Sequence, residues 1–269
     1  MRVTVLGAAG MLGHVVARYL AEAGHSVQTP SHRFDPESPS GFLESLRATH
    51  PEAVVNCIGI RAGSTHQALV DTHVRLVERA LECLKESRAR FIQASTDGVF
   101  RPDLPARRTG ELGDATDDYG KTKWEAELRV RSAGGLVIRC SILGPELRAP
   151  RSLLGWFLSQ PGPVRGFVNH QWNGITTLEW ARLCHGLLEA PSPAPVCQHG
   201  FWPPIPKAEV LKTLGVTWGW PIEVLPEVAP RPVTRTLVPD VSSPSLKSQL
   251  EELRTWYTLR FPSNPLTAD

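Results

Sequence analysis

The chain has 269 residues, 41% of them hydrophobic, and a formal net charge of +2 at pH 7, which fits a globular protein with a sizeable core. Its charges are spread along the sequence, so nucleic acid is not an expected partner, and no apolar run approaches the ~20 residues of a membrane span. The five cysteines are odd in number and mostly sit in apolar runs, so we expect reduced thiols and a cytoplasmic protein.

A strand, a glycine-rich turn and a helix are predicted at the start of the chain. Residues 3–6 are apolar and β-branched, and an apolar helical stripe begins at Leu12. The turn between them places glycines at every third position. A turn of this kind lets the backbone approach a diphosphate at the positive end of the helix. The predicted diphosphate-binding residues are Gly7, Gly10, Met11, Leu12 and Gly13.

The end of the second predicted strand, residues 25–29, bears on the choice of cofactor. An NAD site usually has a carboxylate here for the ribose 2′-hydroxyl. This chain has Ser31, His32 and Arg33 instead, and an arginine suits a 2′-phosphate. We therefore expect NADPH, with NADH as the alternative.

Further strands and helices alternate up to about residue 145. Strands are expected at 34–35, 53–59, 90–94 and 136–140, and helices around 42–46, 70–84 and 119–130. This alternation predicts an α/β protein with a doubly wound parallel sheet of the Rossmann type. Hydroxyls and a carboxylate at 95–97 follow a central strand, where such sheets bind ligands.

Tyr119 and Lys123 are the candidate catalytic pair. If residues 119–123 are helical, the two side chains share a face about one turn apart. A nearby ammonium favours the phenolate and so makes the tyrosine a better proton donor or acceptor at neutral pH.

The C-terminal part is richer in proline, tryptophan and glycine. Helices are expected at 153–158, from Thr176 or Thr177 to about residue 188, between Pro206 and Gly215, and around 246–257. We predict a Rossmann domain over residues 1–145. Residues 146–269 are predicted to form a small substrate-binding lobe, interleaved with the last strands of the sheet.

The segments described above resemble an extended short-chain dehydrogenase/reductase, and within it the dTDP-4-dehydrorhamnose reductase group. The matching segments, in chain order, are residues 7–13, 56–59, 95–100, 119–123 and 172–179, and Arg231-Pro232 followed by Leu237. The resemblance implies that Tyr119 donates a proton to a ketone oxygen, that Lys123 lowers the Tyr119 pKa and bonds the nicotinamide ribose, and that Thr96 aligns the carbonyl. Further cofactor contacts are implied for Asp35, Cys57, Ile58, Gly59, Ser141 and Ile142.

The implied substrate is a nucleotide-activated sugar. Its candidate contacts are Thr96, Asp97, Phe100, Tyr119, Gln171, Trp172, Asn173 and Arg231. Trp172 would either stack on the substrate or pack in the fold. Two positions depart from the family pattern: Gly98 replaces an aromatic residue or cysteine, and His73 replaces an asparagine. His73 would either hydrogen-bond backbone near the catalytic pair or lie on a helix surface.

Three functions fit the resemblance. The first is NADPH-dependent reduction of a keto sugar in surface-polysaccharide or specialised-metabolite synthesis. The second is an epimerase or dehydratase with retained NAD, and the third is a non-catalytic cofactor-binding regulatory subunit. No metal site is expected, and dimers through helices at the side of the sheet are common in such folds.

Overall fold

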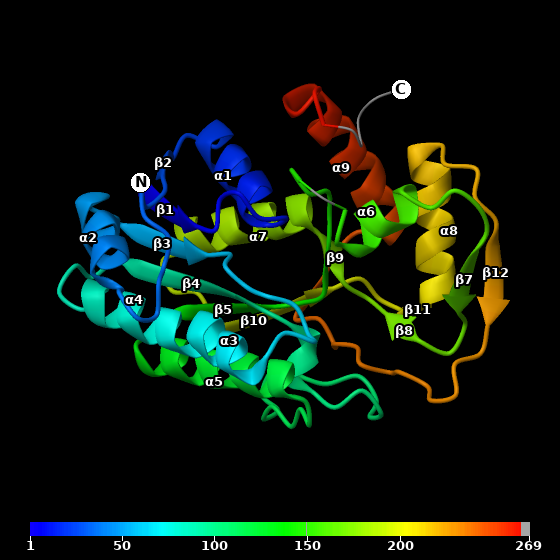
Figure 1. Cartoon of the computed structure of the whole chain (residues 1–269), viewed down its shortest axis with the longest axis horizontal. Coiled ribbons are helices and arrows are strands. Elements are labelled where there is room, and N and C mark those ends of the chain that lie inside the picture. Colours follow the sequence, from blue (N-terminus) through cyan, green and yellow to red (C-terminus); the bar gives the residue numbers. More distant parts are fainter. Residues whose placement is uncertain (149, 265–269) are drawn as a thin grey trace. The chain divides into compact units, whose positions relative to one another are not determined.

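The computed structural model describes residues 1–148 and 150–264 (Figure 1). The chain forms two compact units. Unit 1 contains Met1–Arg101, Leu112–Arg139 and Ala181–Cys197, and unit 2 contains Pro102–Glu111, Cys140–Trp180 and Gln198–Asp269. Each unit therefore draws on segments that are far apart in the sequence.

A seven-stranded sheet has the order β13-β10-β5-β4-β3-β1-β2. Its strands are β1 (Arg2–Leu6), β2 (Ser26–Gln28), β3 (Ala53–Asn56), β4 (Arg90–Ser95), β5 (Leu136–Arg139), β10 (Val196–Gly200) and β13 (Val241–Ser242). β1 pairs in parallel with both β2 and β3, and the pairs β3–β4, β4–β5 and β10–β13 are parallel as well. Strands β1 and β3–β5 are almost wholly buried, as their apolar sequences require. The predicted Rossmann-type α/β fold is confirmed.

Helices cover both faces of the sheet in unit 1. α2 (Ser40–Ala48), α4 (Leu76–Leu84) and α5 (Asp118–Ser132) share one apolar core on one face, which includes Phe42, Val77 and Val130. α1 (Gly13–Glu22) lies on the other face with the later turns of α7 (Thr177–Glu189) (Figure 1). The Tyr19 ring of α1 contacts the His185 ring of α7 there. Sheets of this type bind ligands at the carboxyl ends of their strands.

Several predicted boundaries were wrong. Residues 34–35, which the structure describes, form no strand, and the strand at 53–59 ends at Asn56. The helix expected at 70–84 consists of α3 (His66–Leu69), the π-helix η1 (Val70–Arg75) and α4. α8 (Lys207–Trp218) runs past Gly215 and is followed by Gly219, whose φ of +65° is the left-handed value that terminates helices.

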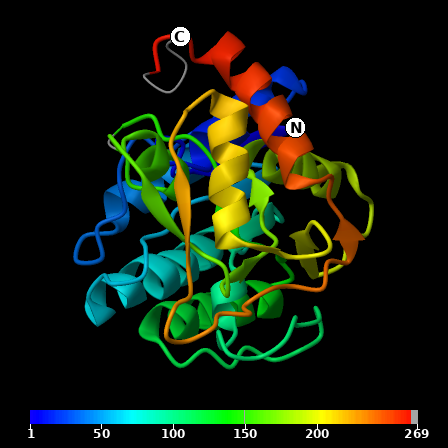
Figure 2. The same cartoon turned by 90° about the vertical axis from the view of Figure 1, so that its right-hand side faces the viewer.

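Unit 2 has its own apolar core. α6 (Leu153–Leu158), α8 and α9 (Leu246–Arg260) contribute Phe157, Leu211 and Leu250 to it. α8 packs on the parallel pair β7 (Val164–Phe167) and β12 (Val224–Glu227), as Figure 2 shows. Shorter pairs join β6 (Ile142–Leu143) to β9 (Ile175–Thr176) and β8 (Gln171–Trp172) to β11 (Ile205–Pro206). Among the described helices, none combines the length and apolar character needed to cross a bilayer.

Candidate active site

The turn between β1 and α1 is closed so tightly that it requires glycine. Gly7 has φ of +78°, and a Cβ on it would lie 2.9 Å from Ile58 Cγ1. A Cβ on Gly13 would lie 2.1 Å from the Gly7 carbonyl oxygen. Gly10 is exposed and donates its N–H to Gly7 O. The turn thus presents bare backbone at a helix N-terminus, which fits a dinucleotide diphosphate.

His14 supports this turn and was not identified from the sequence. It lies in the first turn of α1, is 4% exposed, and its Nδ1 lies 2.8 Å from Gly10 O. The bond ties the helix to the turn that precedes it. The sequence does place this histidine directly after the last glycine of the turn. A contact between a side chain and the backbone four residues earlier has no distinctive sequence pattern, however, so this role could not be predicted.

The loop after β3 lies against the glycine turn. Asn56 Oδ1 accepts the N–H of Ile58, and Asn56 Nδ2 donates to Gln93 Oε1 on the adjacent strand. These bonds hold Ile58 beside Gly7. Burial raises the pKa of the Cys57 thiol, although Lys123 opposes the shift, so Cys57 stays protonated at neutral pH.

The residues after β2 are open to solvent. Ser31, His32, Arg33 and Asp35 are all exposed, and Ser31 Oγ lies 3.1 Å from His32 Nδ1. The Asp35 carboxylate accepts the N–H of Glu37 within a local turn.

Thr96 and Tyr119 meet around Gly98. A Cβ added to Gly98 would lie 3.1 Å from Tyr119 Cε1 and 3.2 Å from Thr96 Oγ1, so both side chains flank this one position. Thr96 begins the short 3-10 helix η2 (Asp97–Val99), where its Oγ1 accepts the N–H of Gly98 and donates to Asp97 Oδ1. Because the distances of 3.1 and 3.2 Å are shorter than ordinary van der Waals contacts, a side chain at position 98 would press on both Thr96 and the Tyr119 ring.

Gly120 allows α5 to approach the end of β4. A Cβ on Gly120 would lie 2.2 Å from the Gly98 carbonyl oxygen and 2.3 Å from the Ala115 side chain. Asp117 caps the helix by accepting the N–H of Gly120 at 2.8 Å. Glycine next to Tyr119 therefore allows the start of α5 to lie this close to Gly98.

Lys123 is anchored one turn further along α5. It is 6% exposed, and its Nζ donates to the Ala94 carbonyl at 2.7 Å. The ammonium therefore lies at the carboxyl end of β4, where the peptide chain turns into Thr96. A buried cation in this place favours the charged form of a nearby phenol.

His73 is a buried link between η1 and α5. It is 2% exposed, its Nδ1 lies 3.0 Å from Thr122 Oγ1, and its ring packs edge-on against Tyr119 at 5.5 Å. Its Nε2 accepts the N–H of Ile60. Burial, followed by the positive charge of Lys123, lowers the pKa of His73 to about 3, so the ring is neutral. The helix-surface interpretation of His73 was wrong.

A buried ion pair fixes α5 on the sheet. Arg139 of β5 and Glu127 of α5 are both fully buried and make a bidentate contact, with Nη2 2.6 Å from Oε2 and Nε 3.1 Å from Oε1. Ser95 Oγ also donates to Glu127. The Arg139 guanidinium lies over the Phe100 ring at 5.0 Å, and Phe100 is fully buried, so Phe100 packs in the core at this contact.

In unit 2, Trp172 and Ser141 are hydrogen-bonded to each other. Trp172 Nε1 donates to Ser141 Oγ at 2.7 Å, and the indole, 4% exposed, packs on Phe201 with centroids 5.8 Å apart. Lys207 Nζ lies 5.2 Å from the centre of the ring. Of the two roles considered for Trp172, these contacts favour packing.

The side chain of Asn173 hydrogen-bonds to the backbone of unit 2. Its Nδ2 donates to the carbonyls of Phe201 and Leu237, and its Oδ1 accepts the N–H of Leu237. Gln171 and Ile142 are half-buried in short strands, and Arg231 is exposed. The predicted residues of unit 1 follow strands β1 to β4 or lie on α5. The candidate roles of the predicted residues in both units stay predictions.

Comparison with known proteins identifies the family. Residues 3–146, more than half of the chain, match the NAD dependent epimerase/dehydratase family. The chain belongs to this family. This membership confirms the resemblance to the extended short-chain dehydrogenases/reductases that was drawn from the sequence.

Individual relatives and structures agree with the assignment. A probable dTDP-4,6-dihydroxy-2-methyloxan-3-one 4-ketoreductase of Streptomyces antibioticus is 31% identical over 140 residues, which is 49% of this chain and 48% of the relative. The chain thus matches about half the length of this curated relative. A dTDP-4-dehydrorhamnose reductase from Clostridium acetobutylicum superposes with a TM-score of 0.82 at 16% identity, covering 96% of this chain and 100% of the other.

A second dTDP-4-dehydrorhamnose reductase, from Bacillus anthracis and in complex with NADP, has a TM-score of 0.81 at 14% identity. It covers 94% of this chain and 98% of its own. At these identities the two structural likenesses show the shared fold.

Proposed function

We propose that the protein uses NADPH to reduce a keto group on a nucleotide-activated sugar. The observation that carries the proposal is the convergence of Thr96, Tyr119 and Lys123 at the carboxyl end of β4. The curated relative that matches about half of this chain is named as a ketoreductase of a dTDP-linked sugar. A reductase of this type needs a proton donor and a carbonyl-aligning group side by side, and Tyr119 and Thr96 supply them.

The proton step follows from the chemistry of these side chains. Bound nicotinamide supplies the hydride that reaches the carbonyl carbon. Tyr119 gives its phenolic proton to the carbonyl oxygen, so the ketone becomes an alcohol and the tyrosine becomes a phenolate. The Lys123 ammonium stabilises this phenolate. The Thr96 hydroxyl turns its hydrogen from Asp97 Oδ1 to the same oxygen and so aligns the carbonyl. Solvent then returns a proton to Tyr119.

NADPH is proposed over NADH because of the residues that follow β2. Arg33 is exposed and can pair with a 2′-phosphate, and Ser31 and His32 add hydrogen-bonding groups beside it. Arg33→Ala should raise the KM for NADPH at least tenfold and leave the KM for NADH within about twofold. An equal change for both cofactors would contradict this assignment.

The activity is tested with a panel of dTDP- and UDP-linked 4-keto sugars. Purified protein and NADPH are mixed with each sugar, and loss of NADPH absorbance is followed. Turnover on at least one dTDP-linked member supports the proposal, and cofactor binding without turnover on any member contradicts it.

Cofactor released by denaturing the purified protein tests the epimerase or dehydratase alternative. Stoichiometric retained NAD would favour that alternative, whereas a reductase should release little. The regulatory alternative predicts cofactor binding with no turnover.

A further inference from the structure

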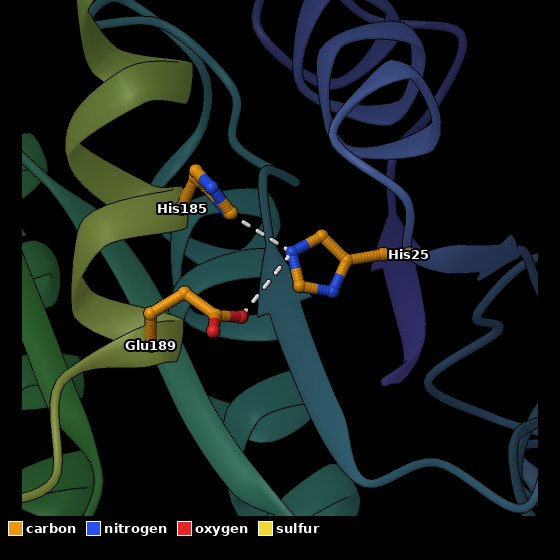
Figure 3. A group of neighbouring side chains, drawn as sticks. All are labelled: His25, His185 and Glu189. Carbon is orange, nitrogen blue, oxygen red and sulfur yellow. Dashed lines mark hydrogen bonds and ion pairs between the residues drawn. The ribbon is translucent and has the colours of Figure 1, made fainter.

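A cluster of metal-ligating groups lies in unit 1, away from the catalytic residues. His25 directly precedes β2, and His185 and Glu189 are one turn apart on α7, from which both face His25 (Figure 3). His25 Nε2 lies 3.0 Å from His185 Nδ1 and 3.8 Å from Glu189 Oε1. All the donor atoms lie within 4.8 Å of one another.

These separations match a shared ion. Zinc binds imidazole nitrogen and carboxylate oxygen at about 2.1 Å, so two ligands of one tetrahedral ion lie about 3.4 Å apart. The two measured distances, 3.0 and 3.8 Å, bracket that value. The third separation, between His185 Nδ1 and the Glu189 carboxylate, is at most 4.8 Å. The Glu189 side chain is 59% exposed, so a rotation of this side chain can shorten that separation.

The two histidines are already held in place. Arg90 Nη1 donates to the carbonyls of Leu187, Leu188 and Ala190, at 2.7, 2.8 and 3.1 Å, and so fixes the last turn of α7. The His185 ring contacts the Tyr19 ring edge-on at 6.3 Å and the His25 ring at 5.1 Å. The His25 side chain is 4% exposed. A site fixed in this way loses little conformational entropy when an ion binds.

We propose that His25, His185 and Glu189 bind one divalent transition-metal ion, best matched by Zn²⁺, which ties the start of β2 to α7. Two imidazoles and one carboxylate are a known zinc ligand set, with water in the fourth position. The ligand set also excludes a site built for Mg²⁺ or Ca²⁺, which prefer oxygen ligands.

The site lies at the opposite edge of the sheet from the catalytic residues. His25 precedes the first residue of β2, whereas Gly7 and Thr96 follow the last residues of parallel strands β1 and β4. The ion would therefore cross-link unit 1 without taking part in the reduction. Its effect is expected on stability, and the site is independent of the proposed function.

Metal binding requires a proton to move within the pair. In the His25–His185 contact, one of the two facing nitrogens carries a hydrogen. That hydrogen passes, through solvent, to the other nitrogen of the same ring, and both rings stay neutral while both facing lone pairs bind the ion. If His25 takes the hydrogen on Nδ1, that atom is buried and lacks a hydrogen-bond partner among the described residues. Because this buried N–H group is not hydrogen-bonded, we expect micromolar affinity for zinc, which is weaker than that of structural zinc sites whose histidine ligands are hydrogen-bonded.

The ordinary alternative is a histidine pair that only packs α7 against β2. The two interpretations are distinguished by titrating untagged, chelator-treated protein with ZnCl2, followed by calorimetry, and with CoCl2, followed by visible absorption. The variants are His25→Ala, His185→Ala and Glu189→Gln. The matched control is His50→Asn, which removes an exposed histidine at a positive φ that asparagine tolerates.

We expect one Zn²⁺ per chain in the wild type and in His50→Asn, with the intense d–d bands of tetrahedral cobalt. His185→Ala and His25→Ala should each weaken binding at least tenfold, and Glu189→Gln should weaken it measurably. Zinc should also raise the unfolding temperature of the wild type but not of His185→Ala. No zinc binding by the wild type, or unchanged binding in His185→Ala, would overturn the proposal. If His25→Ala does not fold, the exposed Glu189 variant and His185→Ala decide the outcome.

Discussion

The buried Glu127–Arg139 pair predicts a large loss of stability when one partner is removed. Glu127→Ala leaves a fully buried guanidinium without its carboxylate and removes the two contacts from Arg139 and the one from Ser95. Breaking such a pair costs about 3–5 kcal/mol. Since these bonds also hold α5 on the sheet, we expect a decrease in kcat as well.

A matched control lies on the same helix. Glu125 pairs with Arg129 at 2.8 Å, but their side chains are 46% and 32% exposed, and surface pairs contribute below about 1 kcal/mol. The free energies of unfolding of wild type, Glu127→Ala and Glu125→Ala are compared by urea denaturation, with circular dichroism and tryptophan fluorescence as probes. Coincidence of the two probes tests whether the two units unfold together.

The double variant Glu127→Leu/Arg139→Met tests the cause of the loss. Replacing a buried pair by apolar residues of similar volume is often neutral or stabilising, so the double variant should recover most of the loss. A Glu127→Ala loss within about 1 kcal/mol of the Glu125→Ala loss would refute the reasoning, because it would show that Arg139 finds another partner or water.

Three further predictions concern single positions. His73→Asn should reduce the dependence of stability on pH, because the unfolded imidazole (pKa 6.5) takes up a proton at a higher pH than the folded one (pKa about 3). Wild-type stability should therefore fall by up to ~1.4 kcal/mol per pH unit below pH 6.5, and urea melts at pH 7 and pH 5 should show a smaller fall in the variant. An equal fall in both proteins would contradict the buried, neutral His73. Gly120→Ala should lower kcat at least tenfold with little change in NADPH affinity, because its Cβ would force α5 away from Gly98 O, and unchanged kinetics would show that the close approach is not needed. Trp172→Phe should cost about 1 kcal/mol through the lost bond to Ser141, measured by urea unfolding, and a greater loss in substrate KM than in stability would instead favour stacking on the substrate.

Local patterns predicted the parts of the site that lie within one turn of the chain. The glycine spacing predicted the turn at Gly7 because a tight strand-to-helix connection has few alternative sequences. The spacing of Tyr119 and Lys123 predicted a shared face because both residues lie on one helix, α5. In both cases the relevant contacts lie within a few residues, where spacing and geometry are closely related.

Contacts between distant residues were not predictable in this way. His73 bonds Thr122, and His25 meets His185 across 160 positions. An isolated histidine in a helix or before a strand has no pattern that shows its partner. Gly215 was taken as a helix end because glycine often occupies that place, but the positive φ that ends α8 belongs to Gly219. The strand β10 was missed because it follows a proline-rich connector and carries Gln198 and His199 among its apolar residues.

The most direct test of the proposed function is the rate of ketone reduction by Tyr119→Phe. This change removes only the phenolic hydroxyl, and the ring packing against His73 is kept. With NADPH and a dTDP-linked 4-keto sugar that the wild type reduces, the single-turnover rate should fall by ~10²- to 10⁴-fold while NADPH affinity is unchanged. A variant that reduces the ketone at the wild-type rate would contradict Tyr119 as the proton donor.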